Sequence, residues 1–154
     1  MNKIILFLTL VSYSVVVSQS FMYMLSLRNT LLALNGSAFT QVRQLIDASM
    51  NTVFRLVMYG AILFNFVYVI INIQSGAGVG LITSIISLVA LVVDGFLTLK
   101  GNVPINEVID GWSPADLPAD WKEVRRSWFN VFKWRQIVNI TGFLSLVTGV
   151  ILNS

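Results

Sequence analysis

The chain has 154 residues, of which 56% are hydrophobic and only 11% are charged, and its net charge is +3. A soluble domain is about 25% charged, so a small chain with a mean hydropathy of +0.79 could not hide its apolar surface from water. The absence of cysteine and histidine excludes disulfides, zinc sites of the Cys/His type, bis-histidine haem and a histidine general base. The composition indicates an integral membrane protein with a single domain, residues 1–154. Its few basic residues are better explained by the orientation of membrane helices than by binding to nucleic acid.

Four apolar stretches follow one another along the chain, and each approaches the roughly 20 residues that a helix needs to cross the hydrocarbon core. They cover residues 4–27, 53–73, 79–99 and 132–152. Helices are expected because lipid offers no hydrogen-bond partner to backbone groups. The sequence predicts an all-α fold: a multi-pass four-helix bundle of the cell membrane, with a polar cytoplasmic segment between the third and fourth helices.

The first stretch has a second interpretation. Lys3, the apolar run to Val17 and the small residues Ser18-Gln19-Ser20 are compatible with a secretory signal and its cleavage site. The apolar run continues through Leu25, beyond that site, which favours a membrane span.

Residues 28–52, between the first two spans, have the pattern of an amphipathic helix. Asn35-Gly36-Ser37 predicts a break before this helix, with Ser37 as its N-cap, and the helix is free to continue unbroken into the second span. Arg43 and Asp47 are interleaved with apolar residues at helical spacing. These apolar residues are Phe39, Val42, Leu45 and Ile46.

The other two connections differ strongly from each other. Residues 74–78 form a short uncharged turn, and their glycines resemble a nucleotide-binding loop only superficially, because they join two spans. Residues 100–131 form a long polar segment that holds all three prolines and five of the seven acidic residues. From Ala119 onward this segment predicts a helix that enters the membrane as the fourth span.

The distribution of positive charge predicts the orientation. With four spans, both termini and the tight turn share one side, which carries Lys3 and the terminal amine. By the positive-inside rule the opposite side is cytoplasmic and both termini are outside, although Lys3 dissents weakly. The basic residues of that opposite side are Arg28, Arg43, Arg55, Lys100, Lys122, Arg125, Arg126, Lys133 and Arg135.

Asp94 is the most informative single residue, because it lies roughly 9 Å inside the third span at 1.5 Å per residue. An isolated carboxylate there is costly, so its side chain is expected to face protein or water. Arg55 and Arg135 begin the second and fourth spans from the same side, and either could pair with it. The structural interpretation is an ion pair that holds helices together; the functional one is the polar wall of a site or a proton-handling group.

Other polar residues fall in the same half of the membrane and could line a pocket that opens toward the cytoplasm. Asp94, Tyr23 and Tyr59 are the candidate acids or bases. The alternative is that hydroxyl and amide groups simply hold membrane helices together, without any ligand. The candidate pocket residues are Gln19, Tyr23, Arg55, Tyr59, Asp94, Arg135 and Asn139.

All four tryptophans belong to the predicted cytoplasmic segment or the helix end that follows it. This placement is typical of an interfacial aromatic belt, and the alternative is an aromatic lid over a flat ligand. They are Trp112, Trp121, Trp128 and Trp134.

Three segments together resemble the anthrone oxygenase-like family of small four-helix membrane proteins. They are the run from Phe39 to Asp47, the segment Asn102-Val-Pro-Ile-Asn106, and the tryptophan-arginine spacing of Trp121, Arg125 or Arg126, Trp128 and Arg135. The resemblance extends over nearly the whole chain in order and spacing. It singles out Asn102, Asn106, Trp128 and Arg135 as family-pattern residues.

The resemblance implies an activity, since named members of that family oxidise anthrones to anthraquinones without a metal or an organic cofactor. This chain departs from relatives that carry a histidine shortly before the final arginine, where Phe132 stands. A histidine-based proton abstraction is therefore not expected here.

Two hypotheses follow. In the first, the protein binds or oxidises a flat, apolar, aromatic or quinone-like molecule from the membrane, with no metal or cofactor. In the second, it is a non-catalytic subunit of a membrane complex or a self-associating protein, since small residues could form helix interfaces. Those residues are Ser84, Ser87, Gly142 and Gly149.

Overall fold

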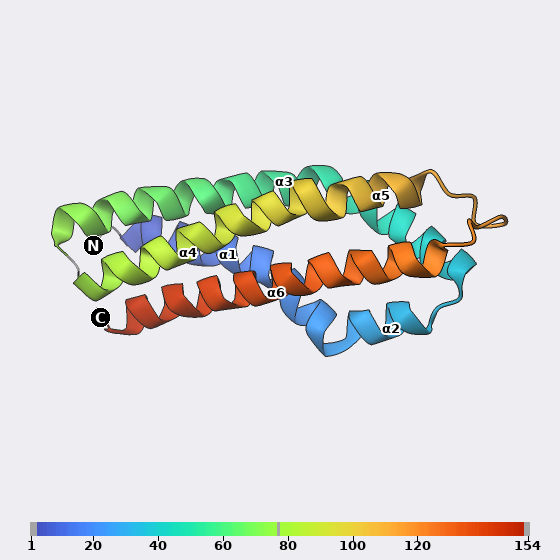
Figure 1. Ribbon diagram of the computed structural model, residues 1–154. Coiled ribbons are helices and arrows are strands. Elements are labelled where there is room, and N and C mark those ends of the chain that lie inside the picture. Colours follow the sequence, from blue (N-terminus) through green and yellow to red (C-terminus); the bar gives the residue numbers. More distant parts are fainter. Residues whose placement is uncertain (1–2, 77, 153–154) are drawn as a thin grey trace.

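The computed structural model describes residues 3–76 and 78–152, and for Asn51 only the backbone. Four of its helical segments are long and apolar enough to cross a membrane, as the hydropathy pattern predicts. They run side by side as an elongated bundle (Figure 1). In chain order the elements are α1 (Lys3–Met22), η1 (Tyr23–Leu27), α2 (Arg28–Ala33), α3 (Gly36–Ser75), α4 (Gly78–Leu97), η2 (Thr98–Asn102), α5 (Val103–Asp110) and α6 (Trp121–Leu152).

The two π-helical turns, η1 and η2, sit within continuous helical segments rather than between separate helices. At each turn a backbone N–H bonds the carbonyl five residues earlier: Arg28 to Tyr23 in η1, and Val103 to Thr98 in η2. Pro104 is the second residue of α5, separated from η2 only by Val103. A proline inside an α-helix lacks its own N–H and clashes with the carbonyl four residues back, so the wider π turn accommodates Pro104 without ending the segment.

Helix α3 confirms the continuity that the sequence permits, because it runs unbroken through 40 residues into the second span. The sequence predicts Ser37 as its N-cap, but the N-cap is Asn35. The Asn35 side chain accepts a hydrogen bond from the Ala38 N–H at 2.9 Å. Asn35, two residues before Ser37 and in an extended conformation, satisfies a free N–H group of the first turn. The helix ends at Gly76, whose φ of 66° requires a left-handed conformation. Ala77, within the predicted turn, lies outside the described residues.

The polar segment at residues 100–131 contains much more helix than its prolines and acids suggest. Its first third continues the α4 segment through η2 and α5, and its last third is the beginning of α6. Residues 111–120 connect α5 to α6, in a compact turn where the Asp116 N–H donates a hydrogen bond to the Ser113 carbonyl. Likewise the first helical segment continues beyond the predicted residue 27, to Ala33.

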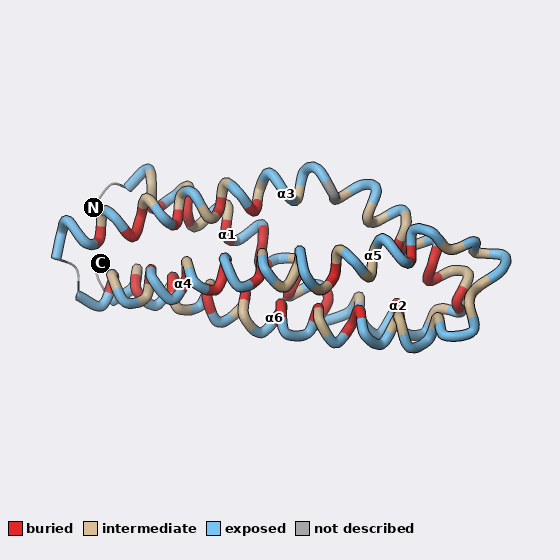
Figure 2. The backbone as a smooth tube through the Cα atoms, turned by 45° about the horizontal axis from the view of Figure 1, so that its top comes forward, coloured by how far each residue is buried: buried red, intermediate tan, exposed pale blue. Residues whose placement is uncertain are grey.

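The bundle buries one face of each helix and exposes apolar side chains on the other (Figure 2). Leu25 and Ile4 are 75% and 70% exposed, which suits a surface that faces lipid rather than water. Polar side chains, among them Asn65, Ser87 and Asp94, are instead fully buried between helices. The start of α1, the end of α6 and the α3–α4 turn lie at one end of the bundle, and the 111–120 connection lies at the other, as the four-span topology predicts (Figure 1).

Candidate functional site

An ion pair between α4 and α6 anchors the candidate site. The Arg135 Nε donates to Asp94 Oδ1 at 2.7 Å, and both side chains are buried. Of the two arginines that the sequence offers as partners, Arg135 is the one in contact. A buried carboxylate without its cation would be strongly destabilising, so this pair accounts for the presence of Asp94 inside the third span.

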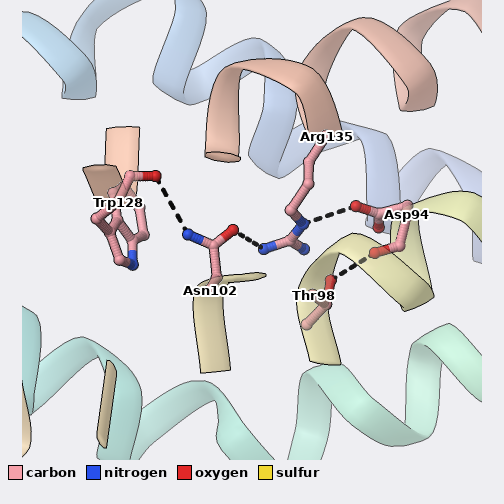
Figure 3. A network of polar contacts seen from close by, with 5 residues as sticks. All are labelled: Asp94, Thr98, Asn102, Trp128 and Arg135. Carbon is pink, nitrogen blue, oxygen red and sulfur yellow. Dashed lines mark hydrogen bonds and ion pairs between the residues drawn. The ribbon is translucent and has the colours of Figure 1, made fainter. Parts of the chain in front are cut away.

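The pair belongs to a network that also includes η2 (Figure 3). Arg135 Nη1 donates to Asn102 Oδ1 at 3.1 Å, and Asn102 Nδ2 donates to the Trp128 carbonyl at 3.2 Å. The Thr98 hydroxyl donates to the Asp94 carbonyl at 2.8 Å. Because the π turn takes more residues than an α turn, it brings Asn102 onto the helix face of Asp94, where Arg135 reaches both.

Asn106 connects a second group of polar side chains, one turn further along α5. Its Oδ1 accepts from Trp128 Nε1 at 2.7 Å and from Arg43 Nη2 at 3.0 Å, and its Nδ2 donates to Asp47 Oδ1 at 2.7 Å. All three of its side-chain contacts reach another helix, so Asn106 ties α5 to both α3 and α6. The family-pattern residues Asn102, Asn106, Trp128 and Arg135 are thus in one connected network.

Arg43 is the second buried arginine of the site, at 4% exposure. Its guanidinium lies 4.2 Å from the centre of the Trp128 ring, a cation–π contact, and Nη1 donates to the Tyr23 hydroxyl at 3.4 Å. Its Nε is buried and has no hydrogen-bond partner among the described residues. The phenol of Tyr23 therefore supports Arg43 here and is engaged as an acceptor.

A cavity of about 570 Å³ adjoins both groups, within the size range of ligand pockets. One end of the cavity is lined by polar side chains and the other by apolar ones. Tyr59 of α3 and Phe96 of α4 are on the cavity wall and are exposed, so the cavity opens at the bundle surface between these two helices. Its walls are formed by Gln19, Arg43, Ile46, Asp47, Met50, Phe54, Arg55, Met58, Tyr59, Ile62, Val92, Gly95, Phe96, Thr98, Leu99, Asn102, Val103, Asn106, Trp128, Phe132 and Arg135.

The residues predicted from the sequence divide into two groups in the structure. Gln19, Arg55, Tyr59 and Arg135 lie on the cavity wall, and so do the family-pattern residues Asn102, Asn106 and Trp128. Asp94, Tyr23 and Asn139 do not form part of that wall. The Asp94 carboxylate is linked to the cavity wall through Arg135, which bonds its Oδ1 and is itself a wall residue.

Sequence reasoning missed Arg43 and Asp47 as site residues and treated them only as part of a motif. The signal was available in the spacing of α3, because Arg43, Asp47, Met50, Phe54 and Met58 recur at three or four residues and form a stripe along the cavity. Asp47 is the carboxylate on the cavity wall.

The site thus combines donors, a carboxylate and an aromatic wall at the end of an apolar cavity. Two arginines and two amides can bind carbonyl or phenolic oxygens, and Asp47 can accept a proton. No family model, curated protein or solved structure matches the chain.

Proposed function

We propose that the protein binds a flat, apolar, aromatic or quinone-like molecule that it takes from the membrane. The observation that carries this proposal is the 570 Å³ cavity, which joins an apolar end to a cluster of buried hydrogen-bond donors. A purely structural bundle has no need for such a space, because cavities cost stability.

The apolar end suits the body of the ligand. Phe54, Met58, Ile62, Phe96 and Phe132 form walls of rings and flexible side chains that can contact a planar hydrocarbon from several sides. The opening between α3 and α4 bears apolar exposed side chains, so a lipid-soluble molecule could reach the cavity without crossing water.

The polar end suits the oxygen atoms of the ligand. Arg43 and Arg135 are held in place by Trp128, Asn106, Asp94 and Asn102, so they meet a carbonyl or phenolate oxygen with little further loss of side-chain freedom. A quinone or hydroxyanthrone carries such oxygens on a flat apolar frame.

The resemblance to the anthrone oxygenase-like family extends the proposal to a reaction. The methylene carbon of an anthrone would lose two hydrogens and gain one oxygen atom of O₂, and the second oxygen atom would leave as water. Asp47 is the candidate base for the first proton, in place of the Asp94 that the sequence suggests, because Asp47 is on the cavity wall. Arg43 would stabilise the resulting enolate.

Binding is tested by titrating the purified protein in detergent with an anthraquinone and following the quenching of tryptophan fluorescence. Gly95→Leu is the informative variant, because no atom lies within 4 Å of a Cβ placed at this cavity residue. A leucine there would take up part of the cavity, so we expect at least a tenfold loss of affinity. Gly60→Leu on α3, where an added Cβ makes only an ordinary contact with the Phe64 ring at 3.8 Å, is not on the cavity wall; it is the matched control and should bind normally.

The reaction is tested separately, by oxygen uptake with an anthrone above the rate of its spontaneous oxidation. Asp47→Asn should lose most of this uptake while it still quenches with the anthraquinone. Binding without uptake in the wild-type protein would mean a carrier or binding protein. The absence of both would favour the alternative of a non-catalytic membrane subunit.

A further inference from the structure

Three buried polar atoms, one of them in the Asp94–Arg135 ion pair, have no hydrogen-bond partner among the described residues, and none of their residues is on the cavity wall. They are Asp94 Oδ2, the Tyr13 hydroxyl and Asn139 Oδ1. Their residues are 0%, 0% and 2% exposed. Leaving such groups unpaired costs about 1–3 kcal/mol each, so three of them in one part of a bundle call for an explanation.

The three atoms come from three different helices that converge at one level. A methyl group at Gly142 in α6 would overlap both the Tyr13 hydroxyl of α1 and the Ala90 side chain of α4, so these three helices touch at Gly142. Helices α4 and α6 are antiparallel neighbours (Figure 1). Asp94 follows Ala90 by one turn and Asn139 precedes Gly142 by one turn, which places both on the same side of the contact, toward Arg135.

We propose that Tyr13, Asp94 and Asn139 bind a water molecule between α1, α4 and α6. The hydrogen-bonding groups fit a single water, which donates to Asp94 Oδ2 and to the side-chain Oδ1 of Asn139 and accepts from the Tyr13 hydroxyl. The water completes the coordination of Asp94, whose other oxygen is occupied by Arg135. This site is separate from the cavity and does not depend on the proposed function, since none of the three residues is on the cavity wall.

The charge balance favours water over a sodium ion, which the same three oxygens could otherwise ligate. Arg135 already neutralises Asp94, so an added cation would leave a net positive charge buried in the bundle, and that is costly. A neutral molecule that donates two hydrogen bonds adds no charge and satisfies both acceptors.

The direct test is a crystal structure of the full chain in a lipidic phase, at a resolution that shows ordered water, with a second crystal soaked in thallium ions. We expect a density peak about 2.5–3.0 Å from all three oxygens and no anomalous signal from thallium there. A thallium peak would overturn the proposal in favour of a cation site. A site without density, with the three side chains bonded to one another, would overturn it as well.

A stability measurement gives an independent answer in detergent solution. Asn139→Leu would displace the water and leave the Asp94 and Tyr13 oxygens unpaired, so we expect its Tm to fall by roughly 3–10 °C. Asn130→Leu, at an exposed position of the same helix, is the matched control and should change Tm little. If the site is dry, Asn139→Leu removes one unpaired group and leaves Tm unchanged or higher. A saturable rise in the Tm of the wild-type protein in sodium but not potassium chloride would also contradict the proposal.

Discussion

At the residue scale, the molecule is organised around two buried arginines that play different roles. Arg135 is held by a carboxylate, Asp94, and by Asn102, whereas the hydrogen bonds of Arg43 go to the neutral groups of Tyr23 and Asn106. The first arrangement joins α4 to α6 and places Asp94 off the cavity wall. The second presents a positive charge at the cavity wall beside an aromatic ring, which makes Arg43 the better candidate for contact with a ligand oxygen.

Removing Arg135 should destabilise the protein more than removing both members of the pair. Arg135→Gln leaves the Asp94 carboxylate buried without its cation, so we expect a loss of about 3–5 kcal/mol in the free energy of unfolding. The double variant Asp94→Asn/Arg135→Gln carries no charge at this pair and should recover part of that loss. Reversible unfolding in mixed micelles measures both.

The matched control for this pair is Lys133→Gln, which removes a positive charge from an exposed position of the same helix. It should change the free energy of unfolding by less than about 0.5 kcal/mol. If the double variant is as unstable as the sum of the two single variants, the two side chains are not coupled and the ion pair does not act as described.

At the element scale, the π turn η2 decides which residues reach the site. It precedes Pro104, lies between Asp94 and Asn106, and brings Asn102 and Asn106 into contact with α6. Gly101 within it lies against Val131 of α6, where a Cβ would be too close, so the π turn and α6 approach each other tightly. A regular α-helix through the same residues would rotate α5 relative to α4 and clash with the ring of Pro104.

Deleting one residue from this turn should therefore harm the protein more than substituting it. With Lys100 deleted, an α turn replaces the π turn and Pro104 meets the carbonyl of the preceding turn, at a cost of about 3 kcal/mol. Lys100→Ala keeps the turn and should unfold close to the wild-type protein. Thermal unfolding in detergent compares the two, and equal Tm values for deletion and substitution would contradict this role of η2.

At the scale of the whole molecule, the two ends of the bundle differ in chemistry. The end with the α3–α4 turn is apolar and short of charge, while the other end carries the amphipathic part of α3, the helix α5 and the polar connection (Figure 1). The cavity opens near this polar end, so a ligand would meet the protein in one half of the membrane. The positive-inside rule predicts that this half is the cytoplasmic one.

Cysteine labelling can test this orientation with single substitutions, because the chain has no native cysteine that must first be removed. Ser75→Cys lies beside the α3–α4 turn and Ala115→Cys lies in the polar connection, and both positions are exposed. In intact cells, a membrane-impermeant maleimide should label Ser75→Cys and leave Ala115→Cys unlabelled until the membrane is permeabilised. The reverse pattern would place the termini in the cytoplasm and show that Lys3 outweighs the basic residues at the other end.

Much of the fold could be predicted from the sequence because the determining properties are local. About twenty apolar residues in a row predict a helix that can cross a membrane. The helical pattern that continues from residue 39 into the second span predicts one long helix, α3, and the short turn after it predicts that the next helix follows closely. The same applies to the concentration of polar residues in one half of the bundle, which follows from their positions along each helix.

The identity of the contacts was decided only by the tertiary structure. The sequence allowed Asp94 to pair with Arg55 or Arg135, since both begin a span at the same depth, and only the close packing of α4 against α6 selects Arg135. The sequence also predicted Asp94 as a pocket residue. In the folded chain the cavity wall instead contains its partner Arg135, and the carboxylate on the wall is that of Asp47. The depth of a residue in the membrane follows from its position along its helix. The rotation of each helix about its axis depends instead on its neighbours and on the π turns, and that rotation determines which side chains share a site.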